Sequence, residues 1–187
     1  MNTPKMFVAV ALVGAMGMVA GCKSAPPLAQ ADAQKLIQAK YDADPAQPVS
    51  ITVSDLGMQQ GANAKLWNRT KTYPNRYWAD FTLTPEGKKA VKLDKGDSLA
   101  WRPNSADDKS YALVIQTAVA THPRVRDVAT PQDAGATKSV TFTEAVNLEG
   151  VQPDLVAIAH NPGNKLSEKK TATFVQDGDH WKLDSIQ

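Results

Sequence analysis

The stretch TATFVQDGDHWKLDSI, residues 171–186, carries the clearest fold signal in this chain. Two segments with alternating apolar and polar side chains, Thr171–Gln176 and His180–Ile186, flank Asp177-Gly178-Asp179. Alternation is the period of a strand with one buried face, and an Asp-Gly pair supplies the positive φ angles that tight hairpins require. The stretch therefore predicts a carboxyl-terminal β-hairpin. Its large apolar side chains face the core in this arrangement: Phe174, Trp181 and Leu183.

Upstream segments predict further strands of a mainly antiparallel sheet, because they alternate in the same way. A segment that is apolar on both faces, Tyr111–Thr121, predicts a central strand. A strand carrying Leu66 or Trp67 is a weaker prediction within Gly61–Arg69. The alternating segments are Val49–Val53, Tyr77–Thr84 and Thr137–Leu148.

Two helices are expected. Ala29–Ala43 has apolar residues at helical spacing and is followed by Pro45, which ends a helix. Thr84-Pro85 forms a capping signal for a short helix through Leu93, because a threonine oxygen accepts an orphan amide and proline fits the first helical position. Asp94–Ser110 is expected to be a polar loop.

The order of these elements, with the closing F-x-x-D-G-x-x-W-K-L pattern, resembles the cystatin-like and nuclear-transport-factor-like lipoproteins. The resemblance covers the last third of the chain and the leading helix. Here two residues separate Gly178 from Trp181, where many members have one. It implies an α+β fold in which an amino-terminal helix packs on a curved, mainly antiparallel sheet. A β-sandwich is the alternative, because most of the predicted strands alternate and helix is scarce.

Length and charge bound the class of protein. A chain of 187 residues suffices for one ordinary domain, which we place at residues 31–187. The formal net charge is +2. Removal of residues 1–21 takes away Lys5, so the 21 basic residues become 20 against 19 acidic ones. A nearly neutral domain has little attraction for nucleic acid, and we expect no nucleic-acid partner.

The first 21 residues differ from the rest of the chain. Lys5 supplies a positive charge, and Met6–Ala20 is an unbroken apolar and glycine stretch. At about 15 residues it is short for a membrane span, which needs roughly 20, and it has the length of the apolar region of a secretory signal. Residues 1–21 are therefore predicted to be a signal peptide.

Val19-Ala20-Gly21-Cys22 ends this segment and resembles the lipobox of bacterial lipoproteins. The resemblance implies cleavage between Gly21 and Cys22, diacylglycerol on the Cys22 thiol and an acyl chain such as palmitate on the new amino terminus. An ordinary signal peptide that happens to end beside a cysteine is the alternative. Cys22 is the one cysteine in the sequence, so no internal disulfide is available, and lipidation accounts for the unpaired thiol.

Two acylated positions hold a protein on a membrane far more firmly than one chain does. We therefore expect a membrane partner through the lipid on Cys22, with residues 22–30 as a tether. In the sorting rule of enteric bacteria, an aspartate after the cysteine retains a lipoprotein in the inner membrane. Lys23 stands there in this chain, which by that resemblance implies the outer membrane, periplasmic face.

Catalytic and metal-binding patterns were not found in the sequence. It has no zinc spacing of histidines and cysteines, no glycine-rich phosphate loop and no G-x-S-x-G elbow. His122, His160 and His180 are widely separated and are expected to be structural or surface residues. We therefore predict no enzyme, no cofactor and no metal site.

Three residues are candidates for a binding site. In a regular strand, Glu144 shares a face with Phe142, where burial would disfavour its charged form. Enzymes of the nuclear-transport-factor-like family place acids in such a cavity, whereas a bulge or a strand end would leave Glu144 wet. Trp78 falls in the polar phase of its strand and Trp101 in a polar loop, and exposed tryptophans are enriched at interfaces. A loop tryptophan that covers the edge of the core is the alternative for Trp101.

These observations predict an outer-membrane lipoprotein whose folded part is a non-catalytic binding or interaction module, with an envelope protein as partner. An inhibitor or immunity protein that blocks a toxin or a cell-wall hydrolase is one alternative. An enzyme of the nuclear-transport-factor-like fold that uses Glu144 in a pocket is the other.

Overall fold

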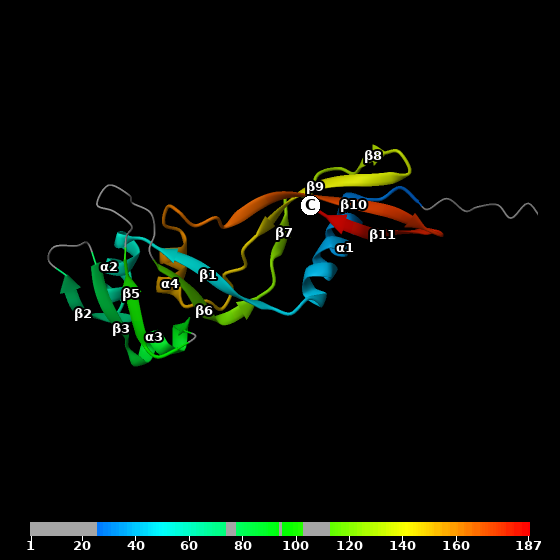
Figure 1. Cartoon of the computed structure of the whole chain (residues 1–187). Coiled ribbons are helices and arrows are strands. Elements are labelled where there is room, and N and C mark those ends of the chain that lie inside the picture. Colours follow the sequence, from blue (N-terminus) through cyan, green and yellow to red (C-terminus); the bar gives the residue numbers. More distant parts are fainter. Residues whose placement is uncertain (1–25, 74–77, 94, 103–112) are drawn as a thin grey trace, which may run out of the picture.

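The computed structural model describes residues 26–73, 78–93, 95–102 and 113–187. Figure 1 shows an elongated molecule with two lobes. The helices are α1 (Gln30–Ala43), α2 (Asp55–Asn63), α3 (Pro85–Ala90) and α4 (Pro153–Ala159). The strands are β1 (Gln47–Val53), β2 (Trp67–Tyr73), β3 (Trp78–Leu83), β4 (Val91–Lys92), β5 (Ser98–Trp101), β6 (Leu113–Thr121), β7 (Arg124–Arg126), β8 (Gln132–Ala134), β9 (Thr137–Ala145), β10 (Ser167–Asp177) and β11 (His180–Ile186).

One lobe, called the α1 lobe below, contains α1 and strands β7–β11. Its antiparallel sheet has the order β11-β10-β9-β7, with β8 also paired to β9. Ala33 and Ile37 of α1 are fully buried against the sheet residues Phe142 and Phe174. The predicted α+β fold, with an amino-terminal helix on a curved antiparallel sheet, is confirmed, and the β-sandwich alternative is wrong.

The predicted hairpin is formed by β10 and β11, and its turn is shifted by one residue from the predicted Asp-Gly pair. Asp177 pairs with His180, so Gly178 and Asp179 make the two-residue turn. Gly178 has φ +66°, while Asp179 is not among the residues with positive φ. Glycine at the first central position is the type II′ pattern, which fits the right-handed twist of the two strands.

The other lobe, called the α2–α4 lobe, contains α2, α3, α4 and strands β1–β6. Two antiparallel sheets of described residues, β1-β6-β4 and β2-β3-β5, enclose a second hydrophobic cluster. Trp67 lies at its centre, fully buried, and its indole Nε1–H donates to the carbonyl of Met58 on α2 at 2.9 Å. The residues predicted as one domain, 31–187, thus bury their side chains in two separate clusters.

Side chains form hydrogen bonds with backbone groups at two sheet edges, one at β7 and the residues beside it and one at β1. Along one face of α1, Gln30, Gln34 and Gln38 donate to the carbonyls of Val128, Val125 and Pro123, respectively. The amide of Val125 in turn donates to Gln38 Oε1 at 2.9 Å. On β1, Asn164 accepts from the Thr52 amide at 2.7 Å and donates to its carbonyl at 2.9 Å. These bonds satisfy edge groups that would otherwise be open to another strand.

Several predicted elements differ from the structure. Residues 94–110 contain a strand, β5, because Leu99 is buried against the core of the α2–α4 lobe. β6 is central, as predicted, but it is not buried on both faces: Val114 is 60% exposed. β9 ends at Ala145, three residues earlier than predicted, and α3 ends at Ala90. Helices α2 and α4 were not predicted.

Candidate functional site

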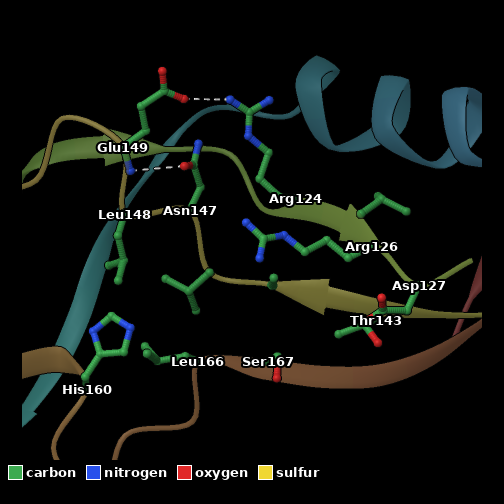
Figure 2. A pocket seen from close by; sticks show the side chains of 13 residues that line it. Arg124, Arg126, Asp127, Thr143, Asn147, Leu148, Glu149, His160, Leu166 and Ser167 are labelled. Atoms are coloured by element: carbon green, nitrogen blue, oxygen red, sulfur yellow. Dashed lines mark hydrogen bonds and ion pairs between the residues drawn. The ribbon is translucent and has the colours of Figure 1, made fainter. Parts of the chain in front are cut away.

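A groove of about 700 Å³ lies where the two lobes meet. Its walls come from β7, the ends of β9 and β10 that adjoin each other, and the segment that leads from β9 to α4 (Figure 2). Polar side chains dominate the lining, and apolar ones occupy part of it. The lining residues are Arg124, Val125, Arg126, Asp127, Thr143, Ala145, Val146, Asn147, Leu148, Glu149, His160, Leu166 and Ser167.

Two arginines on β7 point into the groove but differ in their partners. Arg124 Nη2 donates to Glu149 Oε2 at 2.8 Å, and Asn147 Oδ1 accepts from the Glu149 amide at 3.1 Å. Within the described part of the chain, Arg126 has no ion pair or hydrogen bond from its side chain. Figure 2 shows the Arg126 guanidinium on the side of Asn147, away from Asp127. Arg126 is therefore the cation that the groove leaves open to a ligand.

His160 stands at the opposite wall, at the carboxyl-terminal cap of α4. Its Nδ1 lies 2.7 Å from the carbonyl of Val156. A ring nitrogen facing a carbonyl carries the proton, so Nε2 of the neutral ring is an acceptor and remains exposed to the groove. The groove thus offers a guanidinium, an amide and an imidazole around the half-buried side chains of Leu148 and Leu166.

Glu144 lies on the other face of β9 from the groove. β9 and β10 pair without a register shift here, so Glu144 shares the α1 face with Phe142, as the alternation predicted, and no bulge occurs. Its carboxylate accepts from the Tyr41 hydroxyl and pairs with Lys170 Nζ at 3.0 Å. Burial and the hydrogen bond to Glu144 raise the pKa of the Tyr41 hydroxyl above its ordinary value. Glu144 is not among the residues that line the groove.

Trp78 and Trp101 lie on adjacent strands at the far end of the α2–α4 lobe, where Ala79 pairs with Trp101. Both are half-buried. Trp101 belongs to β5 and packs against the core, and its Nε1 atom is buried without a hydrogen-bond partner among the described residues. Trp78 meets Tyr73 edge-on at 6.2 Å between ring centroids. Neither tryptophan is near Glu144, so the three candidate residues do not form one site.

An ion pair accompanies these tryptophans. The Arg102 guanidinium binds Asp80 and lies 5.3 Å from the centre of the Trp78 ring. Hydrogen bonds from Arg102 and from the Tyr73 hydroxyl hold the pKa of Asp80 below its usual range. Among the described residues, Arg102 and Asp80 thus form an ion pair with each other.

The predicted signal peptide (residues 1–21), the predicted Gly21–Cys22 cleavage site and the predicted lipidation site, Cys22, lie outside the described residues. The first described residues dock on the α1 lobe: the Trp181 indole donates to the Pro26 carbonyl at 2.8 Å, and Leu28 is buried. Packing therefore begins inside the segment predicted as a tether, residues 22–30.

Comparison with protein-family models, with curated proteins and with solved structures finds no match to this chain. The resemblance to cystatin-like and nuclear-transport-factor-like proteins therefore remains a prediction. Among the described residues, no group of histidine, cysteine and acidic side chains is placed to hold a metal ion. None of the described helices has the length and apolar character needed to cross a bilayer.

Sequence reasoning missed the groove because it is formed by residues from separate elements. The one local signal was Arg124-Val125-Arg126, in which alternation around a buried valine sends both arginines to the same face. No pattern indicated that His160, 34 positions further along than Arg126, would stand opposite them.

Proposed function

We propose that this protein is an outer-membrane lipoprotein whose folded part is a non-catalytic binding module with its ligand site in the groove between the lobes. The observation that carries the proposal is the short distance along the chain between the lipobox cysteine, Cys22, and Pro26. The Pro26 carbonyl, four residues after Cys22, accepts a hydrogen bond from Trp181 of the α1 lobe. Four residues of extended chain span at most about 14 Å. Lipid on Cys22 therefore fixes the hairpin end of the α1 lobe close to the bilayer.

The position of the groove supports this orientation. β10 runs from Ser167, which lines the groove, to Gln176, which pairs with Trp181 beside the docked Pro26 carbonyl. Nine steps along a strand at about 3.4 Å each correspond to about 30 Å. The groove thus lies at the end of the sheet that is remote from the anchor, where a periplasmic partner reaches it.

The surroundings of Glu144 support a structural role for this residue rather than a catalytic one. Tyr41 and Lys170 already occupy its carboxylate, and the groove lies on the other side of the strand. A carboxylate engaged in this way stabilises the packing of α1 on the sheet. A role as the pocket acid of an enzyme gains no support from this geometry.

The first experiment tests the anchor. Mass spectrometry of the mature protein is expected to find an amino-terminal Cys22 carrying three acyl chains. The Cys22→Ser variant is expected to lose the acyl chains and to leave the outer-membrane fraction. A mature chain that begins elsewhere, or a Cys22→Ser variant that remains equally in the outer-membrane fraction, would overturn the lipoprotein proposal.

The second experiment tests the groove. A photocrosslinking amino acid at Leu148, inside the groove, is compared in intact cells with the same amino acid at Lys35, exposed on the far side of α1. A binding module predicts a crosslinked species at Leu148 that Lys35 does not give. Equal capture at both positions, or capture only at Lys35, contradicts a ligand site in the groove.

A further inference from the structure

The face of the α1-lobe sheet opposite α1 carries hydroxyl side chains along two neighbouring strands. Phe142, Ala172 and Phe174 point toward α1 and are buried, so alternation places the residues between them on the outer face. The registers bring these hydroxyls into rows: Thr171 faces Thr141, and Thr173 faces Ser139. The outer hydroxyl residues are Thr137, Ser139, Thr141 and Thr143 on β9, and Ser167, Thr171 and Thr173 on β10.

Two cations flank one of these hydroxyls where the face meets the groove. Thr143 of β9 pairs with Arg126 on one side and with Lys169 on the other. Directly opposed side chains in a sheet have Cβ atoms about 5 Å apart, so the Arg126 and Lys169 side chains start about 10 Å apart. Both are exposed, and in the described chain neither has an ion pair. An oxyanion above the Thr143 hydroxyl lies within reach of both cations.

Two acidic residues of the same strands are on the opposite face. Glu144 and Glu168 point toward the α1 side, where Lys170 pairs with Glu144. The acidic residue of β9 and β10 that falls in the outer phase is Asp177, at the hairpin end of β10, eight positions from Lys169. The nearest carboxylate in the groove that lacks a partner is Asp127, at the end of β7, and it opposes anion binding there.

We propose that the row Arg126–Thr143–Lys169, with the hydroxyl-bearing face beside it, binds the oxyanion groups of an anionic polysaccharide. The guanidinium and ammonium recognise sulfate, phosphate or carboxylate groups by charge-assisted hydrogen bonds. The threonine and serine hydroxyls both donate and accept, as sugar hydroxyls do. This inference rests on the proposed function, because it names the ligand class of the binding module.

Dextran sulfate and uncharged dextran of the same chain length are the matched probes, with polygalacturonate as a carboxylate probe and inorganic phosphate as a competitor. The lipidated protein in neutral detergent is expected to bind dextran sulfate and not dextran. Raised salt is expected to weaken the binding because exposed charges are screened. Polygalacturonate that binds more tightly than dextran sulfate indicates a carboxylate ligand, and displacement by phosphate indicates a phosphorylated one.

The double variant Arg126→Gln/Lys169→Gln is expected to weaken dextran sulfate binding about tenfold. The matched control is Lys35→Gln/Lys89→Gln, which removes the same charge from exposed positions on other elements. It is expected to change the affinity less than twofold. Equal losses in the two double variants mean attraction to net charge alone and overturn the proposal, as does absence of binding to every charged probe.

Two single variants sharpen the test. Asp127→Asn removes the repelling carboxylate and is expected to tighten binding about threefold, whereas Thr143→Val keeps the shape, removes the hydroxyl and is expected to weaken it. An Asp127→Asn protein that binds more weakly, or a Thr143→Val protein that binds more tightly, would contradict the assigned row.

If all charged probes fail while Leu148 still captures a partner in cells, the glycan assignment is wrong and the proposed function stands. If Leu148 captures nothing, the proposed function fails with it.

Discussion

Replacement of Glu144 by glutamine tests whether this acid holds the fold together. The Glu144 and Lys170 side chains are 23% and 28% exposed, and their charged atoms are 3.0 Å apart. An exposed ion pair contributes about 0–1 kcal/mol, and breaking a fully buried one costs about 3–5 kcal/mol. A pair exposed by about a quarter falls between these limits, so we expect Glu144→Gln to lower the free energy of unfolding by about 1–2 kcal/mol.

For a chain of this size, 1 kcal/mol corresponds to about 2–4 °C in the melting temperature. Glu144→Gln is therefore expected to melt about 2–8 °C below the native protein, as followed by far-ultraviolet circular dichroism. Glu168→Gln is the matched control, because Glu168 lies directly across from Glu144 and its partner Lys165 is exposed. It is expected to change the melting temperature by less than about 2 °C.

A second substitution decides whether the loss comes from the unpaired cation. In the Glu144→Gln background, Lys170→Met removes the ammonium that the first change leaves without its partner. We expect this double variant to regain at least half of the lost stability. A Glu144→Gln protein as stable as the native one would refute this account, and so would a double variant no more stable than Glu144→Gln.

Three further predictions concern other contacts. Gly61→Ala is expected to destabilise the protein by about 1–3 kcal/mol, because the new Cβ would lie 1.9 Å from the buried Trp67 ring. This clash outweighs the better helix propensity of alanine. Urea unfolding monitored by near-ultraviolet circular dichroism measures the loss of stability. The raised pKa of Tyr41 means that the folded state keeps a proton which the unfolded state loses near pH 10. The stability that Tyr41 contributes is therefore full below about pH 10 and falls as the pH rises further. Tyr41→Phe should flatten this alkaline decline in a pH series of melting curves. Gln38→Leu is expected to cost about 1–2 kcal/mol and to speed hydrogen exchange of the Val125 amide on β7. Two side-chain bonds are lost, one from that amide and one to the Pro123 carbonyl just before β7.

The candidate residues show how far local patterns reach. Alternation correctly placed Glu144 on the face of Phe142, and it placed Trp78 in the less buried phase of β3. It did not reveal that Tyr41, 103 positions earlier, donates to the Glu144 carboxylate. A partner that distant leaves no local signal. The pairing of the Glu144 carboxylate was therefore visible only in the folded chain.

By itself, the sequence determined the elements with a strong period: the hairpin around Gly178, the α1 helix and the strands with one apolar face. It also predicts the lipidated Cys22, because a processing signal is read along an extended chain and needs no fold. Only the tertiary structure decided that the buried residues divide into two clusters and that a groove forms between them. The physical reason is that a groove depends on how Arg126, Leu148 and His160 approach one another in space, and the strand registers and helix packing that bring them together are long-range contacts.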